Sequence, residues 1–243
     1  MLGIKLTWPD KLLWPEAEVT RLGLARYCAD HSDKILPYLK DRPLNFLRCP
    51  DGREGPHFFQ KHRNAGMPAE IATVDIEEKS GGVQPCIVLQ SVQGLIASTQ
   101  VGAMELHVWG ARADKIERPE RVVLDLDPDV SLEFSDMREA ALDLRDVLLA
   151  GGLTSFSLLM GGKGVHIGIP TVRRYASSDI KSFARGFAEA MSRADPERYL
   201  SQASRAKREG RIFIDWLRNE RGSTALAPCT ARARTGGEAR HTS

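Results

Sequence analysis

Three aspartates have the residue type and the spacing needed to hold divalent metal ions. Asp125 and Asp127 flank one leucine in the apolar run 121–127, and Asp215 ends a second short apolar run, 211–215. Because side chains alternate across a strand, Asp125 and Asp127 should project from one face, with Cα atoms roughly 7 Å apart. Carboxylates this close repel each other unless a cation lies between them, and Mg²⁺ or Mn²⁺ prefers oxygen ligands. The pattern favours a pair of divalent metals that activates a 3′-hydroxyl and stabilises a leaving pyrophosphate.

An alternative for the first two carboxylates is purely structural. Asp127 is followed by Pro128 and Asp129, and aspartates commonly cap turns after a strand. Asp215 favours the metal interpretation, because a third carboxylate at a strand end completes the set that bridges two metals in nucleotidyl transfer. We expect the three side chains to converge in space.

Several basic residues and histidines could contact phosphates. Lys163 lies in a Gly-Gly-Lys-Gly turn that is not a Walker A loop, because glycine follows the lysine. A solvated hairpin tip has the same sequence. His166 and His107 could face the site or be ordinary sheet histidines. Arg232 and Arg234 could clamp triphosphate oxygens, or they could belong to a solvated tail.

The elements that must position these residues are clearest in the second half. Apolar patterns predict a strand at 121–127, a helix over 137–148, paired strands at 156–159 and 165–169, a helix over 180–191 and a strand at 211–215. This order predicts an α+β sheet with helices on one face. In the first half we expect a helix near 19–27, with Thr20 as a candidate cap, and extended segments at 44–48, 58–61 and 86–89.

Composition indicates a folded protein of 243 residues, with 42% apolar and 27% charged residues. No secretory signal and no apolar run of about 18 residues is visible, so the sequence predicts a cytoplasmic protein without a membrane span. The cysteines never form a Cys-x-x-Cys pair, which favours reduced thiols over a zinc site or a disulfide framework. They are Cys28, Cys49, Cys86 and Cys229.

Charge is distributed unevenly although the net charge is only +2. Residues 117–150 hold ten acidic side chains against four arginines, and residues 200–243 hold nine Lys or Arg against four acids. A basic segment beside an acidic focus suits a polyanion held next to metal ions. Charge blocks of this kind are also common on solvated surfaces.

The order of these motifs resembles a known family, the polymerase domain of bacterial ATP-dependent DNA ligase D, within the archaeo-eukaryotic primase superfamily. The resemblance runs from about Leu6 to Arg234. Seven stretches carry it: Leu-Thr-Trp-Pro-Asp-Lys-Leu-Leu-Trp-Pro-Glu (6–16), Arg-Pro-Leu-Asn-Phe-Leu-Arg-Cys-Pro-Asp-Gly (42–52), Phe-Phe-Gln-Lys-His (58–62), Glu-Leu-His-Val-Trp-Gly (105–110), Val-Leu-Asp-Leu-Asp-Pro (123–128), Gly-Gly-Lys-Gly-Val-His (161–166) and Ile-Phe-Ile-Asp-Trp-Leu-Arg-Asn (212–219).

The resemblance implies a primase-polymerase fold with an RRM-like catalytic sheet and an N-terminal α/β module. Residues 1–243 would form one polymerase domain, with a DNA-end-binding module at about 1–110 and a catalytic module at about 111–243. The implied activity is template-directed addition of nucleotides, often ribonucleotides, to primer 3′ ends at DNA breaks. The implied partners are gapped DNA, nucleoside triphosphates, the end-binding protein Ku and a DNA ligase, in the bacterial nucleoid.

Matching motifs assign roles to individual residues. Asp125, Asp127 and Asp215 would be the catalytic metal carboxylates, with two Mn²⁺ or Mg²⁺ ions. Lys11 and Arg21 would grip a 5′-phosphate on the downstream strand. The remaining matches would bind the nucleotide, and they are His107, Lys163, His166, Arg232 and Arg234.

Two departures from the family pattern support a second hypothesis. The family usually has Thr-Ser before Gly-Gly-Lys-Gly, whereas this chain has Leu159 and Met160, and the chain ends soon after Arg234. A DNA-end-binding module with weak or lost catalysis is therefore the main alternative. A metal-dependent phosphodiesterase that uses the same carboxylates is a third.

Overall fold

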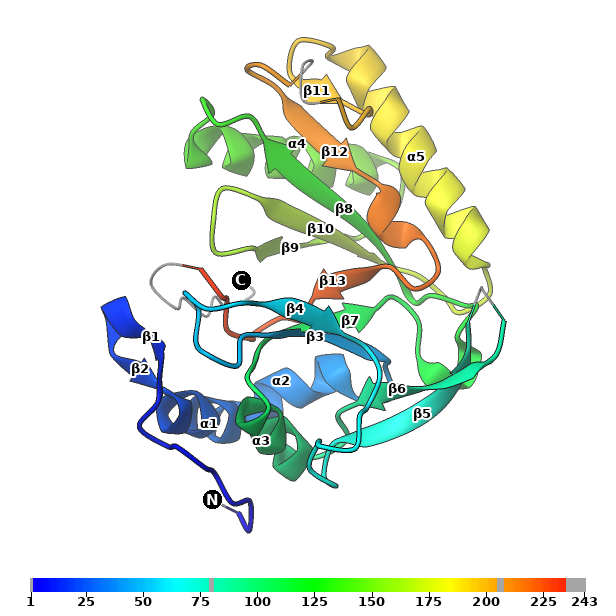
Figure 1. Cartoon of the computed structure of the whole chain (residues 1–243). Coiled ribbons are helices and arrows are strands. Elements are labelled where there is room, and N and C mark those ends of the chain that lie inside the picture. Colours follow the sequence, from blue (N-terminus) through cyan, green and yellow to red (C-terminus); the bar gives the residue numbers. More distant parts are fainter. Residues whose placement is uncertain (1, 79–80, 205–207, 235–243) are drawn as a thin grey trace. The chain divides into compact units, whose positions relative to one another are not determined.

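The chain folds into two compact units, seen in a computed structural model that describes residues 2–78, 81–204 and 208–234 (Figure 1). Of these residues, unit 1 comprises 2–109 and 226–234, and unit 2 comprises 110–225. Residues 226–234 thus return to unit 1 after the chain has completed unit 2. The assignment of DNA-end binding to one module and catalysis to the other stays a prediction.

Unit 1 is built on a six-stranded sheet with three α-helices. The sheet order is β13-β7-β3-β6-β5, with β4 paired to β3, and β1 and β2 form a separate ribbon. The elements are β1 (Leu12–Trp14), η1 (Pro15–Ala17), β2 (Val19–Thr20), α1 (Arg21–Asp30), α2 (Ser32–Leu39), β3 (Leu44–Arg48), β4 (Phe58–Gln60), β5 (Ala72–Glu77), β6 (Val83–Val88), α3 (Val92–Gln100), β7 (Ala103–Trp109) and, from the end of the chain, β13 (Thr224–Leu226).

Local chemistry explains how the helices of unit 1 begin and pack. The Thr20 hydroxyl accepts from the Gly23 amide, so Thr20 is the N-cap of α1, as predicted. In α3, a Cβ on Gly94 would lie 2.7 Å from the Glu70 carbonyl oxygen, so only glycine allows this close approach. The Trp14 indole donates to the Arg232 carbonyl at 2.9 Å and thereby holds the returning segment.

Unit 2 carries a five-stranded sheet in the order β11-β12-β8-β10-β9. Strand, helix, two strands, helix and strand follow one another along the chain, which is the βαββαβ order of ferredoxin-like folds. The elements are η2 (Ala113–Lys115), β8 (Arg121–Pro128), α4 (Phe134–Ala150), β9 (Phe156–Leu159), β10 (Val165–Pro170), α5 (Ser177–Ala194), β11 (Tyr199–Leu200), β12 (Ile212–Asp215) and η4 (Leu217–Asn219).

Alternation along the strands of unit 2 separates its apolar core from its polar face. Leu124 and Leu126 of β8 and Ile214 of β12 pack in one core with residues of α4 and α5. Both helices lie on the same side of the sheet (Figure 1). The residues between these core positions, including Asp125, must therefore face the other side.

The structure confirms the predicted α+β class and the six elements expected in the second half. Their bounds differ by a few residues: β10 extends to Pro170, and α4 begins at Phe134 and ends at Ala150. Sequence patterns did not predict β5, β7, α2 or α3. In β7 all seven residues are buried, so the alternation that marks a half-exposed strand is missing.

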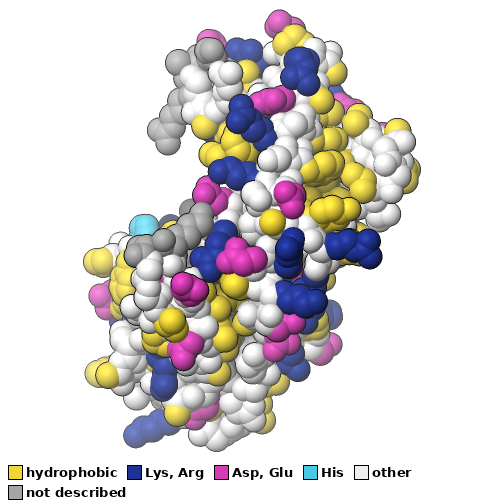
Figure 2. Space-filling model, turned by 90° about the vertical axis from the view of Figure 1, so that its right-hand side faces the viewer, with side chains coloured by type: hydrophobic (Ala, Val, Ile, Leu, Met, Phe, Trp, Pro, Cys, Tyr) yellow, Lys and Arg dark blue, Asp and Glu magenta, His cyan; other side chains and the backbone are white. Residues whose placement is uncertain are grey.

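Two broader expectations can be compared with the structure. Within the described residues, no helix is long and apolar enough to cross a membrane. All four cysteines are buried and form no disulfide, as predicted. On the face drawn in Figure 2, basic and acidic side chains are interspersed, with apolar side chains between them. The basic side chains therefore do not form one continuous basic surface on that face.

Candidate active site

The three predicted metal aspartates meet on two neighbouring strands of unit 2. Asp125 of β8 lies directly opposite Asp215 of β12 in the antiparallel register, and Asp127 lies opposite Phe213. Directly opposed residues project from the same face of a sheet. The three carboxylates therefore share the face that α4 and α5 leave open, whereas the alternation in the sequence predicted a shared face only for Asp125 and Asp127.

Asp125 is the most deeply held of the three, with 9% of its surface exposed. His166 of β10 lies opposite it on the other neighbouring strand, with Nε2 at 3.2 Å from Oδ2. The Arg218 guanidinium approaches the same oxygen at 3.1 Å. Burial acts to raise the pKa of Asp125, but the hydrogen bond and charge of His166, together with Arg218, bring it below its usual value. Asp125 is therefore an anion surrounded by cationic or polar donors.

Asp215 has the opposite tendency. Burial raises its pKa, and the neighbouring charges of Asp125 and Asp127 add to this effect. The Leu217 amide, which donates to Oδ1 at 2.8 Å, and the charge of Arg218 only partly oppose the rise. The negative charges of Asp125 and Asp127 therefore disfavour ionisation of Asp215, and a bound cation would offset this repulsion.

The carboxylate oxygens of the three aspartates are suitable ligands for divalent metals. In this structure they form ion pairs with arginines instead. Arg208 pairs with Asp127 and stacks over the Phe213 ring at 4.6 Å, while Arg218 approaches Asp125 and Asp215. Among the described residues, the oxygens of the three aspartates do not all lie within 4.8 Å of one another. Metal binding would therefore require the arginines to move and the carboxylates to close together.

Lys163 lies in the turn between β9 and β10, as predicted, but its ammonium reaches the loop after β8. It donates to the carbonyls of Val130 at 3.0 Å and Leu132 at 2.6 Å. Glu133 lies 3.8 Å away. These contacts tie the glycine-rich turn to the loop that follows the aspartates, and the side chain stays partly exposed.

In unit 1 the structure joins two of the predicted nucleotide-site residues through a third residue, Glu105. The His107 Nε2 lies 2.8 Å from one oxygen of Glu105, and the Arg232 Nε lies 3.3 Å from the other. The Ala233 amide donates to Glu105 at 2.8 Å. Burial acts to raise the pKa of Glu105, but these partners lower it below its ordinary value. Arg234, the fifth predicted residue, is exposed.

The two residues predicted to bind a 5′-phosphate are neighbours through the backbone but differ in exposure. The Arg21 amide donates to the Lys11 carbonyl at 2.9 Å. The Lys11 ammonium pairs with Asp51 at 2.9 Å and stays partly exposed. Arg21 is buried, and its guanidinium donates to the Thr7 carbonyl at 2.6 Å. Lys11 is therefore the better placed of the two to reach an external anion.

Four residues that support these sites were not singled out from the sequence. Arg208 and Arg218 neutralise the aspartates, and Glu105 organises His107 and Arg232. The Asn219 side chain accepts from the Val123 amide at 2.7 Å and donates to the Val123 carbonyl at 2.6 Å, and so satisfies backbone groups of β8 two residues before Asp125. Glu105, Arg218 and Asn219 all lie within motifs that carry the family resemblance, which was the available signal.

An acidic cluster on the open face of a βαββαβ sheet, with basic residues around it, is typical of proteins that transfer nucleotidyl groups with metals. Residues 20–239 match the family described as "LigD, primase-polymerase domain". The chain belongs to this family, and membership implies nucleotidyltransferase activity.

Named relatives agree with this assignment. The chain is 37% identical over 237 residues to the "Multifunctional non-homologous end joining protein LigD" of Pseudomonas aeruginosa, covering 96% of this chain and 28% of that protein. It is 27% identical over 230 residues to the "Bifunctional non-homologous end joining protein LigD" of Bacillus subtilis, covering 94% of this chain and 37% of that protein. The chain thus spans about a third of the length of these relatives.

A solved structure has the same fold. The polymerase domain of Mycobacterium tuberculosis ligase D, in complex with DNA, superposes with a TM-score of 0.91 at 27% sequence identity. The match covers 99% of this chain and 86% of that one. The family resemblance inferred from the seven motifs is therefore confirmed.

Proposed function

We propose that this protein is a template-directed nucleotidyltransferase that extends primer 3′ ends at DNA breaks, with a preference for ribonucleotides. The observation that carries the proposal is the direct register of Asp125 with Asp215, with Asp127 on the same sheet face. The βαββαβ sheet of unit 2 supports an RRM-like catalytic core. The family match supports the reaction class.

Asp125, Asp127 and Asp215 are proposed to hold two divalent ions, Mn²⁺ or Mg²⁺. Bound there, the ions would supply activation of the 3′-hydroxyl and charge stabilisation of the pyrophosphate. His166 keeps Asp125 oriented by its 3.2 Å contact, and Arg218 keeps Asp125 and Asp215 charged until the ions replace it. The raised pKa of Asp215 supports a cation at this position.

The nucleotide is proposed to contact Lys163, His166, His107, Arg232 and Arg234. Lys163 supplies a mobile cation beside the aspartates, once released from the carbonyls of Val130 and Leu132. In unit 1 the Glu105 carboxylate can only accept hydrogen bonds, so the His107 Nε2 must carry a proton. This leaves Nδ1 to meet a ligand, and Glu105 holds the Arg232 guanidinium in one orientation.

DNA ends and gapped DNA are the proposed substrates, with Ku and a DNA ligase as proposed partners. A relative of this fold has been solved in complex with DNA, and the relatives carry names from non-homologous end joining. Lys11, with Arg21 beside it, is proposed to bind the 5′-phosphate. A dianionic phosphate would displace Asp51 from Lys11, since that ion pair is exposed and weak.

A weak polymerase or a DNA-end-binding module is the second candidate, and Met160 is the observation that favours it. Met160 is 8% exposed and stands directly before the glycine-rich turn, where it offers no hydrogen-bond donor to a phosphate. Primer extension on gapped DNA with Mn²⁺, comparing ribonucleotides with deoxyribonucleotides, separates the candidates. Templated extension that is faster with ribonucleotides supports the proposal. Tight binding to 5′-phosphorylated ends with no extension under any metal supports the binding module.

A further inference from the structure

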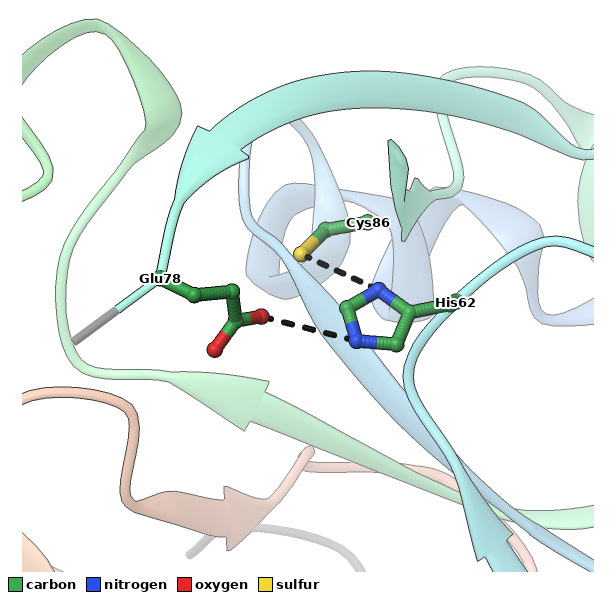
Figure 3. Close-up of side chains that lie close together, drawn as sticks. All are labelled: His62, Glu78 and Cys86. Atoms are coloured by element: carbon green, nitrogen blue, oxygen red, sulfur yellow. Dashed lines mark hydrogen bonds and ion pairs between the residues drawn. The ribbon is translucent and has the colours of Figure 1, made fainter. Parts of the chain in front are cut away.

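A second group of metal-binding side chains lies in unit 1, and it comes from three separate segments (Figure 3). His62 follows β4, Glu78 follows β5, and Cys86 lies in β6. Each offers one ligand atom, and these atoms all lie within 4.8 Å of one another. Within the described residues, no other group of His, Cys, Asp or Glu side chains meets this condition.

The backbone fixes the first two ligands opposite each other. His62 and Cys86 form an isolated antiparallel bridge. It is flanked by hydrogen bonds from the Ile87 amide to the Lys61 carbonyl at 2.9 Å and from the Arg63 amide to the Pro85 carbonyl at 3.2 Å. The two side chains therefore leave the same face, and the Cys86 Sγ lies 3.9 Å from the His62 Nδ1.

Glu78 completes the group from the end of the β5–β6 hairpin. Its amide donates to the Gly82 carbonyl at 2.9 Å, which fixes the residue at the point where the hairpin begins to turn. Its Oε1 lies 3.5 Å from the His62 Nε2. Figure 3 shows the imidazole between the thiol and the carboxylate. The cluster thus links the hairpin end to the segment after β4.

We propose that His62, Glu78 and Cys86 form a binding site for Zn²⁺ or a similar borderline transition-metal ion. A thiolate, an imidazole and a carboxylate are all zinc ligands, whereas the thiolate disfavours Mg²⁺ and Mn²⁺. A nitrogen and a sulfur bound to one zinc ion at about 2.1 and 2.3 Å lie roughly 3.6 Å apart in tetrahedral geometry, so the observed 3.9 Å between the Cys86 Sγ and the His62 Nδ1 needs only a small shift. The Glu78 carboxylate now lies at the other ring nitrogen, Nε2, and must turn to the Nδ1 side of the imidazole to join the same ion. This site is chemically distinct from the aspartates of unit 2.

Burial supports a bound ion that can still exchange with solvent. Cys86 is 1% exposed, which protects the sulfur from oxidants. The His62 side chain is 33% exposed and that of Glu78 is 17% exposed, so an ion can enter along the imidazole. A water molecule would complete four-coordination from that side.

Lys61 now neutralises Glu78 and must yield to the metal. Its ammonium lies 2.9 Å from each oxygen of Glu78, and its side chain is 41% exposed. An exposed ammonium can return to water at little cost, because such ion pairs contribute little stability. Zinc binding should therefore release Lys61, and Lys61→Gln should tighten zinc binding by about two- to fivefold.

Cobalt substitution tests the site without relying on polymerase activity. Titration of the full chain with Co²⁺ should produce a thiolate-to-cobalt charge-transfer band in the near ultraviolet, with an intensity that corresponds to one cobalt–thiolate bond per chain, and Zn²⁺ should abolish it. The aspartates of unit 2 cannot produce this band because they supply no sulfur. Cys86→Ala should remove the band, whereas the matched control Cys28→Ala, which removes another buried sulfur, should keep it.

His62→Gln and Glu78→Gln each remove one proposed ligand, so they test the site even if Cys86→Ala fails to fold. Each should weaken Co²⁺ binding by about a hundredfold or more, since loss of a direct ligand costs at least as much as loss of its supporting partners. Zn²⁺ should also raise the Tm of the parent by more than it raises that of these variants, which keep only the aspartates of unit 2 as proposed metal ligands. A parent protein that gives no charge-transfer band would overturn the proposal. A band that survives both His62→Gln and Cys86→Ala would assign the metal elsewhere and would overturn it equally.

Discussion

Glu105→Gln perturbs the buried network that joins His107 to Arg232 while it preserves side-chain size. Glu105 is 4% exposed, and its carboxylate accepts hydrogen bonds from His107 and the Ala233 amide and forms an ion pair with Arg232. Glutamine keeps one acceptor oxygen but loses the negative charge and places an NH₂ group against one of the donors. Hydrogen bonds to charged groups contribute about 1.5–3 kcal/mol each, so we expect a loss of about 2 kcal/mol in the free energy of unfolding.

The pH dependence of this loss follows from the lowered pKa of Glu105. Because its pKa in the folded protein is below the ordinary value of 4.5, ionised Glu105 stabilises the fold above that value. The stabilisation disappears as the pH falls from 4.5 through the lower, folded-state pKa. The difference in stability between the parent and Glu105→Gln should therefore be largest near neutral pH and should shrink below 4.5.

Urea unfolding at several pH values measures the stability difference, and nucleotide kinetics measure its effect on the proposed site. Glu70→Gln, at an exposed glutamate of unit 1, is the matched control and should leave both unchanged. In primer extension, Glu105→Gln should raise the KM for nucleotide more than it lowers kcat, because His107 and Arg232 lose their orientation. A variant as stable as the parent at neutral pH, or a stability difference that grows on acidification, would refute this reasoning.

Three further variants test the proposed ligand sites. Lys11→Ala should erase any preference for gapped DNA with a recessed 5′-phosphate over the same DNA with a 5′-hydroxyl, whereas Asp51→Asn should strengthen that preference by freeing Lys11; equal affinity of the parent for both ends at moderate salt would exclude the pocket. Met160→Ser should lower the KM for nucleotide by roughly tenfold if it restores one charge-assisted hydrogen bond, with DNA-end binding unchanged; an unaltered KM would place Met160 away from the triphosphate.

The sheet of unit 2 was largely predictable because its signals are local. The apolar run before Pro128, the helical spacing of 137–148 and the glycine-rich turn each determine their own element. Alternation along β8 also predicts correctly that Asp125 and Asp127 share a face. The direct pairing of Asp125 with Asp215 needs the register of two strands that are about ninety residues apart, which no local pattern specifies.

The supporting residues were not predictable for related reasons. In the sequence, Glu105 has the pattern of an ordinary polar residue in a strand. Arg232 reaches it only because residues 226–234 return to unit 1. The cysteines lack the close sequence spacing of zinc ligands, and a zinc site was therefore not predicted. His62 and Cys86 are 24 residues apart in the sequence and come together only through a β-bridge. Arg21 is buried because the chain around Thr7 folds over it. Its position in the sequence predicted a cation but not this burial.

The central claim, that three aspartates on one sheet face support metal-dependent nucleotidyl transfer, is tested most directly by Asp215→Asn. This change keeps the size of a half-buried side chain that accepts from the Leu217 amide, and it removes the negative charge that two divalent ions require. Templated primer extension on gapped DNA should be readily measurable in the parent with Mn²⁺. Asp215→Asn should lower the rate by at least about a hundredfold while the unfolding transition stays close to that of the parent. Extension by Asp215→Asn at the parental rate would contradict the account.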